Sequence, residues 1–117
     1  MGNFQKLRVW LLAKNLAVKI YKLTQSSLFI KDFGFREQIQ RAAVSIPSNI
    51  AEGDESGTNK LSIRYFYTAK GSVAELQTQI IIAHEIGYIE SNLKDSLVND
   101  CNLISVMLTK IIKARLE

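Results

Sequence analysis

One long segment with helical periodicity, residues 59–88, constrains the fold of this chain more than any other feature. Small and apolar residues recur in it at alternating spacings of four and three. Such spacings place residues on one face of an α-helix, and a long seam of them is typical of helices packed side by side in a bundle. The segment therefore predicts one long helix in an all-α domain. The seam consists of Ser62, Phe66, Ala69, Val73, Leu76, Ile80, Ala83 and Gly87.

Three further segments, about residues 5–25, 33–53 and 92–115, have the same period and no strand-like alternation. The chain holds only 6 glycines and 1 proline, which favours a few long helices over many short elements. Short connections between long helices predict an antiparallel up-down-up-down four-helix bundle, and the length predicts a single domain over residues 1–117. The expected breaks and caps are Gln25–Ser27, Asp32, Gly53, Gly57, Thr58 or Asn59, Gly87, and Ser91 or Asn92.

A second apolar row lies on the 59–88 helix, displaced by more than about 100° from the seam. A helix in a small monomeric bundle is expected to be polar there. The first helix has a weaker row of the same kind. Exposed apolar rows usually contact a partner, so we predict self-association, as a ring or as a two-fold dimer. The candidate interface residues are Leu7, Leu11, Val18, Ile63, Tyr67, Ala74, Ile81 and Tyr88.

The positive charge of the chain is concentrated at its start. The net charge is +4, from 15 basic and 11 acidic residues. Residues 1–31 hold six basic and no acidic side chains, so the other 86 residues, with nine basic and eleven acidic ones, sum to −2. This segment is either a solvated helix face or a surface that contacts nucleic acid. We see no export segment and no run near the roughly 20 apolar residues of a membrane span, so we expect a cytoplasmic protein without a membrane partner.

The single proline, Pro47, falls inside the helical pattern of residues 33–53. Proline in a helix interior removes one hydrogen bond and clashes one turn back, at a cost of about 3 kcal/mol, and it predicts a kink. It also frees backbone groups, notably the Ala43 carbonyl. We interpret Pro47, Asn49, Glu52 and Gly53 as a structural motif, in which Asn49 serves the freed backbone and Glu52 stabilises the helix end. Ligand binding by Asn49 and Glu52 is the alternative.

The residues that support catalysis or metal binding are sparse. There is one histidine, His84, and one cysteine, Cys101. A di-iron bundle needs two Glu-x-x-His pairs, which one histidine cannot supply. Glu52 and Glu55 have the i, i+3 spacing of a magnesium site but lack a second acidic pair. We therefore expect no catalytic residue, metal or cofactor, with magnesium-dependent hydrolysis at Glu52 and Glu55 as a further hypothesis.

Residues 41–53 closely resemble the hallmark of the four-helix-bundle proteins encoded by intervening sequences within bacterial 23S ribosomal RNA genes. Similar proteins form pentamers around a central channel, and the resemblance implies a homopentamer here. Related accessory proteins of diversity-generating retroelements are basic pentameric bundles that bind nucleic acid and a reverse transcriptase. Supporting matches are Leu7–Trp10, Ala13, Ile20–Thr24, Phe33–Phe35, Gln38–Ile39, Tyr65–Phe66, Ala69–Ser72, Glu75–Leu76 and Gly87–Tyr88.

The leading hypothesis is a non-enzymatic homopentamer that binds RNA or DNA phosphates. Asp54 and Glu55 stand where the family is often basic or neutral, which argues against phosphate contact at that loop and favours the first helix. The alternative hypothesis is an adaptor or assembly factor that binds another protein and no nucleic acid. The candidate nucleic-acid-binding residues are Arg8, Lys14, Lys19, Lys22, Arg36 and Arg41.

Overall fold

The computed structural model describes residues 3–116, apart from the side chain of Ser27, and the described residues contain helices and no strand. The expectation of an all-α fold is confirmed. Two short elements accompany the long helices: a 3₁₀ helix, η1 (Phe4–Lys6), and a one-turn helix, α2 (Ser27–Ile30). The long helices are α1 (Arg8–Leu23), α3 (Phe33–Glu55), α4 (Asn59–Glu85) and α5 (Ser91–Leu116).

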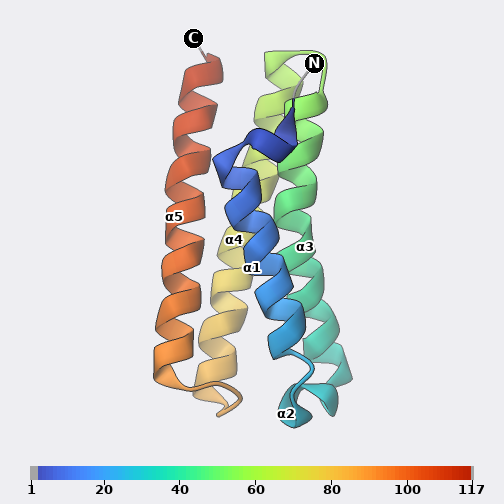
Figure 1. Cartoon of the computed structure of the whole chain (residues 1–117), viewed down its shortest axis with the longest axis vertical. Helices are drawn as coiled ribbons and strands as arrows, with labels where there is room; N and C mark the ends of the chain where they lie inside the picture. The colour runs from blue at the N-terminus through green and yellow to red at the C-terminus, as the bar shows by residue number, and fades with distance from the viewer. Residues whose placement is uncertain (1–2, 117) are drawn as a thin grey trace.

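The four long helices lie side by side in a body of 45 × 21 × 20 Å. Contacts join α1 to α3, α3 to α4, α4 to α5, and α5 back to α1, while α1 and α4 lie diagonally opposite. The contact between α1 and α5 is the least extensive of the four. Figure 1 shows the chain reversing direction between consecutive long helices, so that the start of α1 and the end of α5 lie at the same end of the body.

The predicted helix ends agree with the structure to within a few residues, because the capping residues act as expected. The Asp32 side chain accepts a hydrogen bond from the Phe35 amide at 3.3 Å, and Thr58 accepts one from the Leu61 amide at 3.2 Å. Gly87 has a φ of 84°, the left-handed conformation that ends α4. Ser91 differs from the prediction, since it is the first residue of α5 rather than its cap.

The helix α2 lies where the sequence predicts only a connection. Its Phe29 is fully buried, with its ring centroid 5.8 Å from that of Phe35 and 5.0 Å from that of Tyr88. Aromatic rings at these separations pack favourably beyond the area they bury. This aromatic cluster closes one end of the bundle, and its residues come from α2, α3 and the turn after α4.

The seam of α4 forms the centre of the core, as predicted. Every seam residue from Ser62 to Ala83 is buried, and Gly87 alone is exposed, because it lies in the turn after the helix. Burial of apolar area at this scale is the main term that stabilises the fold. None of the described helices combines the length and the apolar character needed to span a membrane.

The helix α3 continues through Pro47, which is buried within it. Asn49 Nδ2 donates to the Ser45 carbonyl at 2.8 Å and to Ser45 Oγ at 3.0 Å. Ser45 Oγ in turn lies 2.9 Å from Ser72 Oγ of α4. Asn49 therefore serves the Ser45 carbonyl instead of the predicted Ala43 carbonyl, because a helical side chain points back over the turn that precedes it.

Candidate functional site

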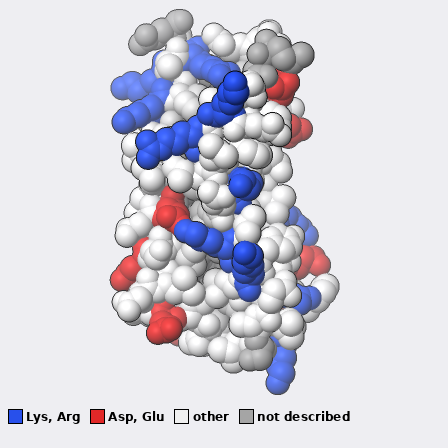
Figure 2. Space-filling model, in the orientation of Figure 1, with Lys and Arg blue, Asp and Glu red and all other residues white. Residues whose placement is uncertain are grey.

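The basic side chains of α1 lie on its outward face. Figure 2 shows lysines and arginines running along the face that α1 shares with α5, with the acidic side chains mostly toward its edges. Lys19 Nζ pairs with Asp100 Oδ2 of α5 at 3.0 Å, and Lys14 donates to the Asn15 side chain at 2.9 Å. Within the described part of the chain, Arg8, Lys14 and Lys22 make no ion pair. Three of the four α1 candidates therefore carry uncompensated charge.

The two candidates on α3 are placed differently from those on α1. Arg36 has its guanidinium carbon 5.4 Å from the centre of the Phe33 ring, which is a cation–π contact. Arg41 pairs with Glu37 at 3.3 Å and lines a surface hollow together with Tyr21 of α1. Arg41 thus lies beside α1, although Glu37 offsets part of its charge.

Sequence reasoning missed a second basic group, at the end of α5. Lys110 and Lys113 are exposed on its last turns, at the same end of the bundle as Arg8. Cations at a helix C-terminus also interact favourably with the helix dipole. The net charge of −2 over residues 32–117 hid this group, because that sum combines these lysines with acidic residues of other helices. Counting charge in shorter windows could have found it.

The apolar rows are exposed at their centres and covered at their ends. Tyr67 and Ile81 on α4 are 54% and 38% exposed, and Ala74 between them is also exposed. On α1, Leu11 and Val18 are 40% and 44% exposed. Exposed large apolar side chains at helical spacing on two helices are typical of a surface that another molecule covers.

Leu7, Ile63 and Tyr88 are only partly exposed and pack against the core. Leu7 precedes α1 and Tyr88 follows the Gly87 turn, so neither continues the phase of its predicted helix. The Tyr88 hydroxyl donates to Asp32 Oδ2 at 2.8 Å. That hydrogen bond, with burial and the Asp32 charge as further causes, raises the pKa of Tyr88.

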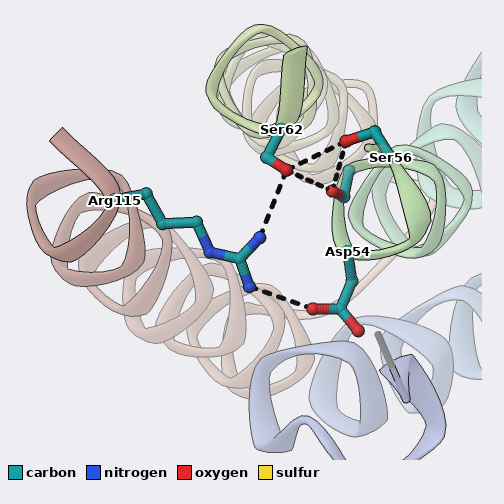
Figure 3. A network of polar contacts seen from close by, with 5 residues as sticks. Asp54, Ser56, Ser62 and Arg115 are labelled. Carbon is teal, nitrogen blue, oxygen red and sulfur yellow. Dashed lines mark hydrogen bonds and ion pairs between the residues drawn. The ribbon is translucent and has the colours of Figure 1, made fainter. Parts of the chain in front are cut away.

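A polar network at the α3–α4 corner holds the end of α5 (Figure 3). Arg115 Nη2 donates to Asp54 Oδ1 at 3.0 Å, and Arg115 Nη1 donates to Ser62 Oγ at 3.2 Å. The Gly53 carbonyl accepts from Ser62 Oγ at 2.6 Å and from Ser56 Oγ at 2.7 Å. The Asp54 side chain is only 7% exposed, and the Arg115 side chain 27%. The network therefore joins three long helices through a largely buried ion pair.

The contacts around this network show what two residues of the predicted structural motif, Gly53 and Glu52, do in the fold. A Cβ on Gly53 would lie 2.6 Å from Phe66 Cε1 and 3.1 Å from Tyr65 Cβ, so only glycine permits this approach of α3 to α4. The Glu52 side chain is exposed and makes no ion pair or hydrogen bond with the other described residues. The predicted role of Glu52 at the helix end thus falls to Asp54 and Ser56. Asp54, treated from the sequence as a loop residue, is an internal partner of α5.

The remaining reactive side chains are few. Burial raises the pKa of the Cys101 thiol to about 12, with the nearby Asp100 charge as a smaller cause. His84 Nε2 lies 3.1 Å from Ser91 Oγ, across the turn between α4 and α5. Within residues 3–116, no three side chains among His, Cys, Asp and Glu gather closely enough to hold a metal ion.

The fold and this surface define an all-α protein of four long helices with one predominantly basic face. The family of 23S rRNA-intervening sequence proteins matches residues 5–110, and the chain belongs to this family. A similar solved structure is that of a protein of unknown function from the S23 ribosomal protein family of Bacteroides thetaiotaomicron. It is 27% identical with a TM-score of 0.83, over 90% of this chain and 98% of that one. No curated protein matches the sequence.

Proposed function

We propose that the protein is a non-enzymatic, cytoplasmic homopentamer of antiparallel up-down-up-down bundles that binds RNA or DNA through phosphate contacts. The observation that carries this proposal is the basic face of α1, where Arg8, Lys14 and Lys22 have no acidic partner among the described residues. Basic side chains that contact phosphates give affinity without reading sequence. Lys110 and Lys113 are also exposed, on the part of α5 that lies at the same end of the bundle as the start of α1.

The two exposed apolar rows support self-association. The α1 row (Leu11 and Val18) and the α4 row (Tyr67, Ala74 and Ile81) lie on diagonally opposite helices. Two different faces on one subunit suit a heterologous contact, in which the α4 row of one copy covers the α1 row of the next. Such contacts close into a ring when the rotation that relates one copy to the next adds up to a full turn after a whole number of copies. A ring of five would also carry five copies of those basic residues of α1 that the contact leaves accessible, and so raise avidity for an extended polyanion.

Binding of a fluorescently labelled single-stranded RNA and of a DNA of the same length, followed by anisotropy across a salt series, tests the proposal. We expect the dissociation constant to rise steeply with salt, because released counterions drive phosphate binding. Affinity that is unchanged at high salt, or the absence of binding at low salt, would contradict it. Sequencing of nucleic acid that co-purifies from the native cell then identifies the natural ligand.

A further inference from the structure

A groove with an apolar floor runs between α1 and α5, along the least extensive of the four helix contacts. One part, about 220 Å³ in volume, is lined by Leu12, Leu16 and Leu103, with Asn15, Lys19 and Asp100. A second part, about 430 Å³, is lined by Leu23, Leu93 and Leu97, with Lys19, Lys22 and Ser96. Lys19 borders both parts, so we treat them as one surface and name it the α1/α5 groove.

The residues of the groove follow helical spacing on both helices. Leu12 faces Leu103 in the first part, and Leu23 faces Leu93 in the second, as the antiparallel direction of α1 and α5 requires. Leu23 lies eleven positions after Leu12, which at a rise of about 1.5 Å per residue gives a groove of roughly 16 Å. That length corresponds to about three turns of an α-helix.

The floor and the rim of the groove differ in exposure. Leu16 and Leu97 are each 1% exposed and belong to the core, whereas Leu93 and Leu103 on the rim are 38% and 44% exposed. A third helix laid in the groove would cover the exposed leucines without opening the core. Amphipathic helices bind grooves of this kind through apolar residues at i, i+3 or i+4, and i+7.

The charge around the groove indicates which side chains the polar face of a bound partner helix should carry. Lys22 lies on the rim without an ion pair to any described residue, and Lys19 is paired with Asp100, the one acidic residue of the lining. Arg8 lies one turn before Leu12 on α1, and Lys110 two turns after Leu103 on α5, both exposed. The flanks are therefore mainly positive, which favours acidic side chains on the partner and disfavours basic ones.

We infer that the α1/α5 groove is a docking site for an acidic amphipathic helix of another protein, about three turns long. Its apolar residues cover Leu93 and Leu103, and its carboxylates face Lys19 and Lys22. This inference goes beyond the proposed function, because the affinity of the partner helix for the groove rests on apolar contact as well as on charge. The neutral variants Leu93→Asn and Leu103→Asn remove the apolar contact and leave the phosphate-binding charges in place.

A designed peptide tests the inference directly. The probe is a labelled helix of about fourteen residues, with leucine at i, i+3, i+4 and i+7 and glutamate on both flanks. The matched control peptide carries lysine in place of each glutamate. We expect the acidic peptide to bind the purified protein and the basic peptide to bind at least about tenfold more weakly. Equal binding of the two peptides, or no binding of the acidic one, would overturn the inference.

Protein variants locate the contact. Leu103→Asn and Leu93→Asn should each weaken the acidic peptide about tenfold or more, as expected for apolar contacts central to a small interface. Val106→Asn is the control, since Val106 is 53% exposed on α5 but is not part of the lining. RNA binding should be the same in all three variants. If Val106→Asn weakens the peptide as much as Leu103→Asn, or if Leu103→Asn lowers the mass in light scattering because a second copy fills the groove, the inference is wrong.

Discussion

At the scale of single residues, Gly53 permits the close packing of α3 on α4. Gly53→Ala adds a methyl group that would meet the Phe66 ring at 2.6 Å. Overpacking of this kind costs about 1–3 kcal/mol of the free energy of unfolding. Gly71→Ala is the matched control, because a Cβ there meets nothing within 4 Å and should stabilise α4 by about 0.5–1 kcal/mol. Urea denaturation measures both, and equal effects of the two variants would count against the packing argument.

Arg115 compensates a buried carboxylate. Arg115→Ala removes the ion-pair partner of Asp54, whose side chain is 7% exposed in the intact protein and whose Oδ2 already lacks a described hydrogen-bond partner. Loss of one member of a buried pair is strongly destabilising, and we expect about 2–3 kcal/mol because Arg115 is itself partly exposed. Asp54→Asn in the same background should recover part of that stability. Lys113→Ala, on the exposed side of the same turn, should change the unfolding free energy by less than about 0.5 kcal/mol.

Cys101 should be inert in the folded protein. A pKa of about 12 leaves roughly one thiol in ten thousand ionised at pH 8, and the side chain is fully buried. The thiol should therefore react with a disulfide reagent only after unfolding in urea. Because the folded pKa is raised, the thiolate fraction of the native protein rises about tenfold per pH unit but stays near one in a hundred at pH 10. Rapid reaction of the native protein at pH 8 would contradict this prediction and show that the packing around Cys101 opens.

At the scale of elements, local signals in the sequence predicted each long helix but not the one-turn helix α2. The period of α4, the caps Asp32 and Thr58, and the Gly87 turn are all encoded within a few residues. The burial of Phe29 in α2 depends on Phe35 and Tyr88, which the fold brings together from distant parts of the chain. The pairing of Asp54 with Arg115 is equally non-local, since 61 positions separate them. Periodicity in the sequence predicts which face of a helix a residue lies on. It does not predict which residue of another helix that side chain contacts.

The exposed row of α4 should govern self-association. Tyr67→Glu or Ile81→Glu places a charge in the proposed interface, and burial of an unpaired charge there is unfavourable. Each variant should lower the mass measured by light scattering toward that of a monomer, while circular dichroism shows unchanged helicity. Thr68→Glu, exposed on another side of α4, is the control and should keep the parent mass. If Tyr67→Glu and Ile81→Glu also keep it, the interface lies elsewhere.

At the scale of the whole molecule, the polar network, the exposed apolar rows and the basic side chains lie on different, overlapping sets of helices, and α1 carries both an apolar row and basic residues. A largely buried polar network joins α3, α4 and α5 at one corner, the apolar rows on α1 and α4 are exposed, and basic residues follow α1 and the end of α5. The sequence predicted the first-helix part of this charge, because it lies in one continuous segment. It did not predict the α5 part, because the charge of residues 32–117 was taken as one total. It did not predict the α1/α5 groove, because the groove arises only when helices from the two ends of the chain are brought side by side.

The most direct test of the account is the salt dependence of RNA binding in charge variants of α1. The triple variant Lys14→Ala, Lys19→Ala, Lys22→Ala should weaken binding at low salt and flatten the plot of log affinity against log salt by about one unit for each phosphate that is no longer neutralised. Lys60→Ala and Arg64→Ala, on the diagonally opposite helix α4, provide the control. The account predicts a lower slope for the α1 variant alone. An unchanged slope, or an equally flattened slope in the α4 control, would contradict a nucleic-acid interface on α1.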